Sequence, residues 1–416
     1  MSKPRLAVLH YTAPPVIGGV EAVISAHVQV IQEFNYPVTV IAGRGEASAL
    51  PEGVEFIRYS ELDTQSAALE KLNSKLSAGV LPEEFNTLVD QITGGLAPIL
   101  DLFDTLIVHN LFTKHFNLPA TVSLNRLLDR KVIKRCIAWC HDFTWTSPRS
   151  GHKVHPGYPW DLLREKRPEV TYVVVSEERC RELAELYNCP EDEIQVVYNG
   201  VDPGRILGLS KTGQDLVARL GVLDADIALL MPVRVTKAKN IELALKVVAA
   251  LKEKGIRPKL VLTGPPDPHE SRSIEYFHTL KDLRDELDIV EEMRFVFECG
   301  PDPEKPYTIG LEVVGDLFRV CDVMFMPSHT EGFGMPVVEA GLAGLLVVST
   351  PVPAAVEIGR EDVRIFDAET DPGQLAEELI AWIDSNPLLC FRRRVRQNYT
   401  WQEIFRKEIE PMLLRK

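Results

Sequence analysis

Short apolar runs rich in β-branched residues alternate along the chain with stretches of helical hydrophobic period. Five such runs lie in the N-terminal half, at residues 5–11, 37–43, 105–110, 133–142 and 170–177. Five more follow a polar break, at residues 227–234, 259–265, 293–299, 322–328 and 345–350. Amphipathic helical patterns separate them, as at residues 20–34 and 240–255. Strands interleaved with helices predict βαβ units and parallel sheets, whose sites lie at the carboxyl ends of the strands.

The polar break predicts the domain organisation. Residues 203–226 are polar and contain four glycines, and a chain of 416 residues is too long for one ordinary core. We therefore place a boundary near residue 203 and predict two doubly wound, Rossmann-like α/β domains that face a cleft. Residues 61–102 have a helical pattern that is long for one crossover connection. Whether this segment shapes the cleft is left open.

Composition restricts the class of partner. The net charge is −14 and the pI is about 5.3, whereas a nucleic-acid-binding protein needs a basic surface. A negative net charge does not exclude a local basic pocket for one anionic ligand. A short basic run at residues 391–397 is predicted to be a solvated helix face.

Hydropathy and cysteine content predict a cytoplasmic protein. No apolar run approaches the roughly 18–20 residues that span a bilayer. We interpret the short apolar run near the N-terminus as a first strand rather than a signal peptide. The seven cysteines have neither zinc-finger nor redox spacing, and we expect them to be reduced and mostly buried.

Two basic residues follow the predicted strand that ends at Val233. Arg234 and Lys239 precede a predicted helix that begins near Asn240. A helix N-terminus adds N–H donors and a partial positive charge, so the combination suits a diphosphate. Lys237 is expected to face solvent. Taken alone, the stretch is better explained as surface loop charges, the usual position of Lys and Arg.

Two carboxylates frame a glycine-rich turn after another predicted strand of the same half. Glu331 precedes the turn, and Glu339 lies in the helix that Pro336 begins. Gly332 and Gly334 allow the backbone to approach a ligand closely. An ionised carboxylate accepts two hydroxyl hydrogens, as vicinal diols require. The alternative makes Glu331 a helix cap and Glu339 a solvated helix residue.

Together, the two stretches predict a binding site for a sugar nucleotide. Both lie at strand ends in the same half, and one supplies cations for a diphosphate while the other supplies acceptors for sugar hydroxyls. At this point the chain resembles the family 4 retaining glycosyltransferases of the GT-B fold. The matching stretches, in the family's order, are VIGGVEAVISAHV (16–28), CHDFTW (140–145), VVYNGVD (196–202), PVRVTKAKN (232–240), EGFGMPVVEAGLAG (331–344) and NYTWQEIF (398–405).

The resemblance implies a domain role for each part of the chain. Residues 1–203 would form the acceptor-side domain and residues 204–395 the nucleotide-sugar domain. Residues 396–416 would form a C-terminal helix that packs back on the N-terminal domain.

The resemblance also implies residue roles. The residues given a catalytic role are Arg234, Lys239, Glu331 and His141. The first two would hold the donor diphosphate and stabilise it as the leaving group, and the other two would contact the hexose. The expected donor-binding residues are Gly18, Gly19, Phe333, Gly334, Met335 and Glu339, with Glu339 on the ribose. For His141 alone, a satisfied core histidine is the more frequent outcome.

The chain departs from the family pattern at three places. Val233 replaces a common glycine. Asn240 replaces another, and as a good helix cap it is expected to be harmless. Residues 263–268, TGPPDP, replace a glycine-rich turn that commonly lies near the nucleobase, so the base, uridine or guanosine, stays open.

The implied function is retaining transfer of a hexose from a UDP- or GDP-hexose to a hydroxyl of a small-molecule or glycan acceptor. Neither a cofactor nor a metal is expected, and the triplet from Asp224 to Asp226 is treated as chance. No membrane or nucleic-acid partner is expected, and the acceptor and the oligomeric state are left open. The alternatives are a sugar-nucleotide-binding protein without transferase activity, or a GT-B epimerase or phosphorylase. A dehydrogenase is disfavoured, because VIGGVEAV lacks the G-x-G-x-x-G spacing.

Overall fold

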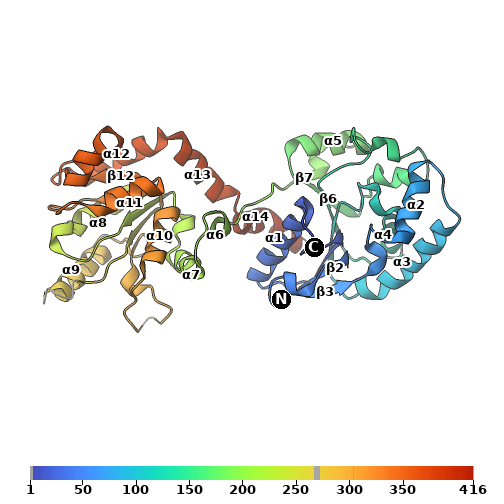
Figure 1. Ribbon diagram of the computed structural model, residues 1–416, viewed down its shortest axis with the longest axis horizontal. Helices are drawn as coiled ribbons and strands as arrows, with labels where there is room; N and C mark the ends of the chain where they lie inside the picture. Colours follow the sequence, from blue (N-terminus) through green and yellow to red (C-terminus); the bar gives the residue numbers. More distant parts are fainter. Residues whose placement is uncertain (1–2, 267–271, 303, 416) are drawn as a thin grey trace. The chain divides into compact units, whose positions relative to one another are not determined.

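The computed structural model describes residues 3–266, 272–302 and 304–415. The chain divides into two compact units (Figure 1). The first comprises Met1–Gly200 together with Trp401–Lys416, and the second comprises Val201–Thr400. We call them the N-terminal and the C-terminal unit and describe each by itself.

The N-terminal unit is built on a seven-stranded sheet whose paired strands all run parallel. The strand order is β3-β2-β1-β4-β5-β6-β7. The strands are β1 (Leu6–Thr12), β2 (Val38–Arg44), β3 (Glu55–Arg58), β4 (Thr105–His109), β5 (Cys136–Cys140), β6 (Val170–Val174) and β7 (Ile194–Val196). The order reverses between β1 and β4, and at such a switch point the loops diverge and open a crevice at the carboxyl ends of the strands.

Helices cover both faces of this sheet (Figure 1). The helices of the unit are α1 (Gly19–Glu33), α2 (Ala67–Ser77), α3 (Glu84–Leu100), α4 (Leu118–Asp129), α5 (Glu177–Tyr187), α14 (Trp401–Ile404) and α15 (Glu410–Leu414). Successive residues of β1 point to opposite faces. Leu9 belongs to a core cluster that includes residues of α3, α4 and α5, whereas Val8 belongs to one that includes residues of α1 and Phe405 of the C-terminal segment. Trp401 and Phe405 are thus part of the core of the N-terminal unit.

The C-terminal unit contains a six-stranded sheet, also parallel throughout its pairs, in the order β10-β9-β8-β11-β12-β13. Its strands are β8 (Ile227–Met231), β9 (Pro258–Leu262), β10 (Met293–Phe295), β11 (Val323–Met326), β12 (Leu346–Ser349) and β13 (Arg364–Ile365). Its helices are α6 (Pro203–Ile206), α7 (Lys211–Leu220), α8 (Ile241–Glu253), α9 (Ser273–Glu286), α10 (Leu311–Val320), α11 (Met335–Ala343), α12 (Pro372–Asp384) and α13 (Pro387–Asn398). Here the switch point lies between β8 and β11.

The predicted fold class, two doubly wound α/β units, is confirmed by these sheets. The ten predicted strands are all present, and three further strands, β3, β7 and β13, were not predicted. All three are short, and β3 and β13 are partly or fully exposed edge strands. The long helical segment at residues 61–102 contains two separate helices, α2 and α3.

The basic run at residues 391–397 lies on α13, and the prediction of a solvated face is wrong for Arg396. The Arg396 guanidinium is buried and pairs with Asp322, with Nη1–Oδ1 and Nη2–Oδ2 distances of 3.0 and 2.9 Å. It also donates to the carbonyl of Ala225 at 2.9 Å. Asp322 in turn accepts the backbone N–H of Ala228 in β8. The pair therefore joins α13 to the amino ends of β8 and β11.

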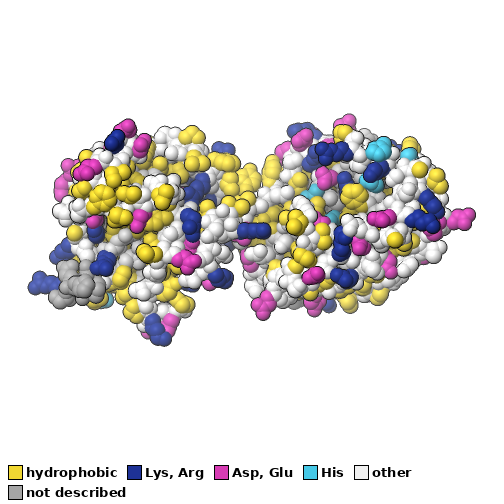
Figure 2. Space-filling view, in the orientation of Figure 1, with side chains coloured by type: hydrophobic (Ala, Val, Ile, Leu, Met, Phe, Trp, Pro, Cys, Tyr) yellow, Lys and Arg dark blue, Asp and Glu magenta, His cyan; other side chains and the backbone are white. Residues whose placement is uncertain are grey.

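The surface carries charges of both signs. On the face shown in Figure 2, basic and acidic side chains are interspersed over each unit. Within the part of the chain that the structure describes, none of the helices combines the length and the apolar character that a membrane span requires.

Candidate functional site

The two motifs of the C-terminal unit meet at the switch point of its sheet. The basic stretch follows β8, the two-glutamate stretch follows β11, and these strands are neighbours in the sheet. The N–H of His329 donates to the carbonyl of Ala238 at 2.8 Å, which joins the two loops directly. The arrangement follows the general rule that ligands of doubly wound sheets bind where the strand order reverses.

An ion pair forms the centre of this site. The Lys239 ammonium lies 2.5 Å from Oε1 of Glu331, and the two side chains are only 19% and 14% exposed. The Ser328 hydroxyl donates to the same carboxylate oxygen at 2.9 Å. Thr350 holds Ser328 in turn, because its hydroxyl donates to the Ser328 carbonyl at 2.6 Å. Glu331 is therefore positioned by a network from three loops.

This geometry argues against the helix-cap interpretation of Glu331. A capping role would require its carboxylate to accept from the first turn of α11. The N-cap residue is instead Gly334, which forms no side-chain cap. The hydrogen bonds of Glu331 go to Ser328 and Lys239. Glu331 is thus a partner of the cation that precedes it in the chain, not a helix cap.

The glycine turn is fixed where α11 begins. Gly334 has φ +99°, and a Cβ there would lie 3.1 Å from the Met326 side chain, so another residue would be strained. The N–H of Ala354 donates to the Phe333 carbonyl at 2.9 Å. The Phe333 and Met335 side chains are exposed. Pro336 has no N–H and the Val337 N–H donates to the Gly334 carbonyl at 3.0 Å, so the backbone N–H groups that could face a ligand here are those of residues 333–335.

Three predicted positions lie at the margin of this cluster. Arg234 is on the exposed side of the loop after β8, and Glu339 is exposed on α11. Among the described residues, neither forms a hydrogen bond with Lys239 or Glu331 in this structure. Asn240 precedes α8 but does not cap it with its side chain, so that expectation is wrong. Its φ of +48° lies in the left-handed region, which Asn adopts more readily than most residues. This backbone conformation explains why an asparagine occupies the position.

Two further sequence features of this unit are the TGPPDP stretch and the Asp224–Asp226 triplet. Of the TGPPDP stretch, Asp267 and Pro268 lie outside the described residues. Asp226 accepts the backbone N–H of Arg257 at 2.8 Å and its Nη2 at 2.9 Å, which accounts for one acid of the Asp224–Asp226 triplet. Across the described ranges, no group of three or more His, Cys, Asp or Glu side chains is arranged to hold a metal ion.

The N-terminal unit brings His141 together with two histidines that the sequence reasoning missed. His10 lies near the end of β1, His109 ends β4 and His141 follows β5, and these three strands are adjacent. Nδ1 of His10 donates to the His109 carbonyl at 2.9 Å. Nδ1 of His109 lies 3.0 Å from Nε2 of His141, and the two rings stack. Each of the three predicted strands has a histidine at or near its carboxyl end, and this pattern in the sequence could have revealed the cluster.

Burial keeps these histidines neutral. It lowers the pKa of His141 to about 4, with a further contribution from His10. It also lowers the pKa of His109 and, to about 3, that of His27, which packs against Trp139. Asn110 fixes the strand end, because its side-chain carbonyl accepts the His141 N–H at 2.8 Å. The cluster can therefore give or take single hydrogen bonds without adding charge.

The glycine pair Gly18–Gly19 lies where α1 begins. The Glu21 side chain folds back over Gly18, where a Cβ would lie 2.1 Å from its Oε2. The Thr12 hydroxyl donates to Glu21, whose carboxylate is 4.0 Å from Nε2 of His10. Gly19 is exposed and lines a pocket of about 350 Å³ at the carboxyl ends of β1 and β4. The structure thus brings Gly19, but not His141, into the lining of this pocket.

Acid is expected to destabilise the N-terminal unit through its histidines. His27 and His141 have folded pKa values of about 3 and 4, below the value of about 6.5 in an unfolded chain. Between pH 6.5 and about 4 the unfolded state binds the extra protons, so stability falls as the pH falls, by up to roughly 1.4 kcal/mol per pH unit for each histidine. Urea unfolding between pH 7.5 and 4.5 measures this slope.

A His27→Phe variant keeps an aromatic ring beside Trp139 and removes one titrating group. Its unfolding free energy should depend less steeply on pH than that of the wild type. Equal slopes in the two proteins would show that His27 does not contribute.

Comparison with known proteins relates the C-terminal unit to a family. Residues 216–400 match the family model described as glycosyl transferases group 1. The match includes the basic loop, the Lys239–Glu331 pair and α11. This segment is therefore similar to the group 1 glycosyltransferases, and the resemblance to GT-B glycosyltransferases is confirmed at that level. Assignment to family 4 stays a prediction.

Individual relatives are more distant. An uncharacterized glycosyltransferase of Methanocaldococcus jannaschii is 28% identical over 194 residues, 46% of this chain and 45% of the relative. A D-inositol 3-phosphate glycosyltransferase of Saccharomonospora viridis is 29% identical over 228 residues, 54% of this chain and 48% of the relative. The mannosylglucosylglycerate synthase of Petrotoga mobilis is 25% identical over 288 residues, 65% and 63% of the two chains. The chain thus spans about half the length of the first two relatives.

Proposed function

We propose that the protein is a retaining glycosyltransferase that moves a hexose from a UDP- or GDP-hexose to a hydroxyl group of a small-molecule or glycan acceptor. The observation that carries the proposal is the Lys239–Glu331 pair at the β8/β11 switch point, beside the N-terminus of α11. It combines a cation for a diphosphate, an acceptor for sugar hydroxyls and free backbone N–H donors within two adjacent loops. The family of residues 216–400 supports the same class of activity.

In the proposed mechanism, donor binding exchanges the partners of the ion pair. The diphosphate takes the Lys239 ammonium, because a phosphate oxygen is a stronger anionic partner there than a single carboxylate oxygen. Glu331 stays in place through the Ser328 hydroxyl and then accepts hydroxyl hydrogens of the hexose. Arg234 adds a second positive charge near the diphosphate. Glu339 is proposed to bind the ribose, and the N–H groups of residues 333–335 to face the donor.

The proposed chemistry needs no nucleophile from the protein. The bond between the hexose C1 and the diphosphate oxygen breaks, and the acceptor oxygen forms its bond to C1 on the same face. The acceptor proton passes to the departing phosphate oxygen. Negative charge grows on the diphosphate during this step, so Lys239, Arg234 and the start of α11 stabilise the transition state more than the ground state.

For the N-terminal unit we propose a role in acceptor binding. The neutral His141 and the Gly18–Gly19 backbone are proposed to contact the donor, His141 on its hexose. Two relatives carry names that refer to small polar molecules, D-inositol 3-phosphate and mannosylglucosylglycerate. A small polar acceptor is therefore proposed here too.

All seven cysteines are free thiols, which supports the proposal of a cytoplasmic protein.

Product analysis tests the proposal. The protein is incubated with UDP- and GDP-hexoses and a panel of sugar, polyol and sugar-phosphate acceptors, each with excess EDTA or with magnesium. We expect a glycoside with the anomeric configuration of the donor, formed equally in EDTA, because fixed cations stabilise the leaving group. Inverted product would refute the retaining mechanism, and turnover restored only by a divalent cation would refute metal independence. Donor binding without any product would favour a sugar-nucleotide-binding protein.

A further inference from the structure

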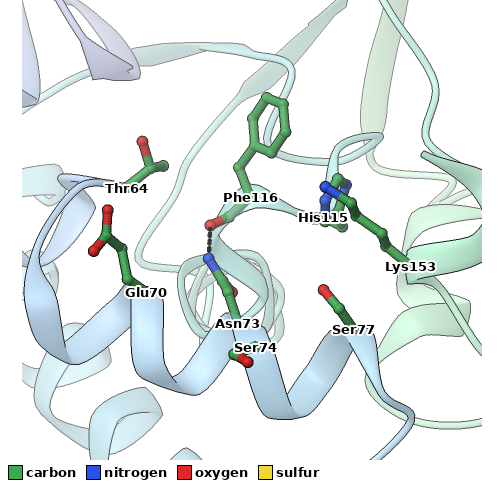
Figure 3. A pocket seen from close by; sticks show the side chains of 8 residues that line it. All are labelled: Thr64, Glu70, Asn73, Ser74, Ser77, His115, Phe116 and Lys153. Atoms are coloured by element: carbon green, nitrogen blue, oxygen red, sulfur yellow. Dashed lines mark hydrogen bonds between the residues drawn. The ribbon is translucent and has the colours of Figure 1, made fainter. Parts of the chain in front are cut away.

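A second pocket adjoins the first one in the N-terminal unit. Its volume is about 360 Å³. Thr64 and Phe116 line it (Figure 3) and also line the first pocket. One wall is α2, which contributes residues on successive turns: Glu70, Asn73, Ser74 and Ser77. The opposite wall comes from the segments around His115 and Lys153. This pocket lies outside the residues to which the proposed mechanism gives a role.

The lining of the second pocket is polar and unevenly charged. Glu70 and Thr64 lie at one end, and His115 and Lys153 lie at the other (Figure 3). Asn73 closes the wall between them, because its Nδ2 donates to the Phe116 carbonyl at 2.8 Å. Hydroxyl and amide groups of α2 therefore face a basic end, an arrangement that suits a polyol carrying a negative group.

The basic end lacks a counter-ion. Lys114 lines the first pocket beside Phe116, and its ammonium lies 5.0 Å from the centre of that ring. Among the described residues, no carboxylate lies within 4 Å of the ammonium of Lys114 or of Lys153. Asp142 is a carboxylate that raises the pKa of Lys114, and Glu70 lies at the end of the second pocket opposite Lys153. Two partly buried cations thus share one small region without an ion-pair partner.

The titration of the neighbouring groups agrees with this excess of positive charge. Burial lowers the pKa of Lys114; Asp142 opposes that shift and Lys153 adds to it. Burial also lowers the pKa of His115 to about 4, and Lys153 and Lys114 lower it further. Each positive charge therefore disfavours the protonated form of its neighbours, and an anion placed between them would relieve this repulsion.

We infer that the paired pockets bind the acceptor substrate, and that this substrate is a small polyhydroxy compound with a phosphate or carboxylate group held by Lys114 and Lys153. The inference rests on the proposed function and specifies its acceptor. The acceptor hydroxyls would meet Asn73, Ser74 and Ser77, while the anionic group lies at the basic end. The overall charge of −14 makes such a local basic site selective for one small ligand rather than for a polyanionic surface.

Calorimetry without donor tests the inference independently of turnover. The probes are glucose 6-phosphate, 3-phosphoglycerate, glycerate, glucose and glycerol, titrated into the wild type and into Lys153→Gln, Lys114→Gln and Lys71→Gln. Lys71 is exposed on α2 outside the pocket lining and is the matched control. We expect an anionic probe to bind more tightly than its neutral analogue. Its Kd should rise about ten- to a hundredfold in Lys153→Gln and Lys114→Gln and stay unchanged in Lys71→Gln.

Comparison of the phosphorylated with the carboxylated probes identifies the anionic group, and tighter binding of either supports the inference. Three outcomes would overturn it: no anionic probe binds at millimolar concentration, the neutral analogue binds equally well, or Lys153→Gln and Lys114→Gln bind like the wild type. Thermal melts of each variant show whether the protein is still folded. UDP and GDP titrations in the same samples report on the donor site separately, so failure of the proposed function is distinguishable from failure of this inference.

Discussion

Replacing Lys239 with alanine is expected to lower kcat for hexose transfer by about 100- to 1,000-fold. The ammonium is the cation at the centre of the β8/β11 site, and removal of one preorganised donor to a developing negative charge typically has an effect of this size. Affinity for UDP or GDP should fall as well, because the free diphosphate already carries charge. Steady-state kinetics and calorimetry measure the two losses.

The neighbouring lysine provides a matched control. Lys237 lies on the same turn but is exposed, with its ammonium 6.0 Å from the centre of the Tyr276 ring. Lys237→Ala should retain wild-type kinetics. The double variant Lys239→Ala/Glu331→Ala removes the whole ion pair and leaves no unpaired buried charge. Recovery of activity in the double variant would show that Lys239 acts only by neutralising Glu331, and this would contradict the account.

Glu331→Gln is expected to separate hexose recognition from diphosphate binding. Glutamine can still accept the Ser328 hydrogen bond, but it loses the charge that pairs with Lys239. We expect kcat to fall about ten- to a hundredfold, the usual effect of losing a charged hydrogen bond. Affinity for free UDP or GDP should be unchanged or higher, because the diphosphate no longer competes with a carboxylate for Lys239.

Glu339→Gln is the informative comparison for Glu331. Glu339 is exposed on α11 and is proposed to bind the ribose, so this change should weaken binding of the free nucleotide itself. Calorimetry, kinetics and thermal melts of both variants distinguish the two roles. Wild-type turnover in Glu331→Gln, with only a lower melting temperature, would mean that the Lys239–Glu331 pair is structural.

The fold could be predicted because parallel strands buried on both faces form continuous apolar runs. The strand at Ile227–Met231 is buried at every position and is apolar throughout. The strand at Glu55–Arg58 carries charged residues at both ends and lies at a sheet edge, so its pattern does not differ from that of a loop. Length and burial, rather than strand propensity, decided which strands were predicted.

Candidate donor-site residues could be selected from the sequence, but the contacts between them could not be predicted. The spacing of Arg234, Lys239 and Glu331 indicated a diphosphate and a sugar. The ion pair depends on β8 and β11 being neighbours in the sheet, and 92 residues separate its two partners in the chain. A local pattern of residues in the sequence does not show which strands are neighbours in the sheet. The same limit explains why His10 and His109 were missed while His141 was selected.

Charge runs were the least reliable signal. Arg396 lies in a basic run that is typical of a solvated helix, yet it is buried against Asp322. Sequence reasoning assigned an exposed position because short basic runs usually form a solvated helix face. Its partner, Asp322, directly precedes a strand in another part of the sequence. Only the tertiary structure therefore shows that the arginine is buried in an ion pair.

The most direct test of the central claim is calorimetry of UDP and GDP binding to the wild type and to Lys239→Ala. The account predicts binding of at least one of the two nucleotides at micromolar to millimolar concentration in the wild type. It also predicts a Kd raised at least about tenfold in Lys239→Ala, with Lys237→Ala unchanged. Absence of binding by both nucleotides in the wild type, or equal affinity in the wild type and Lys239→Ala, would contradict it.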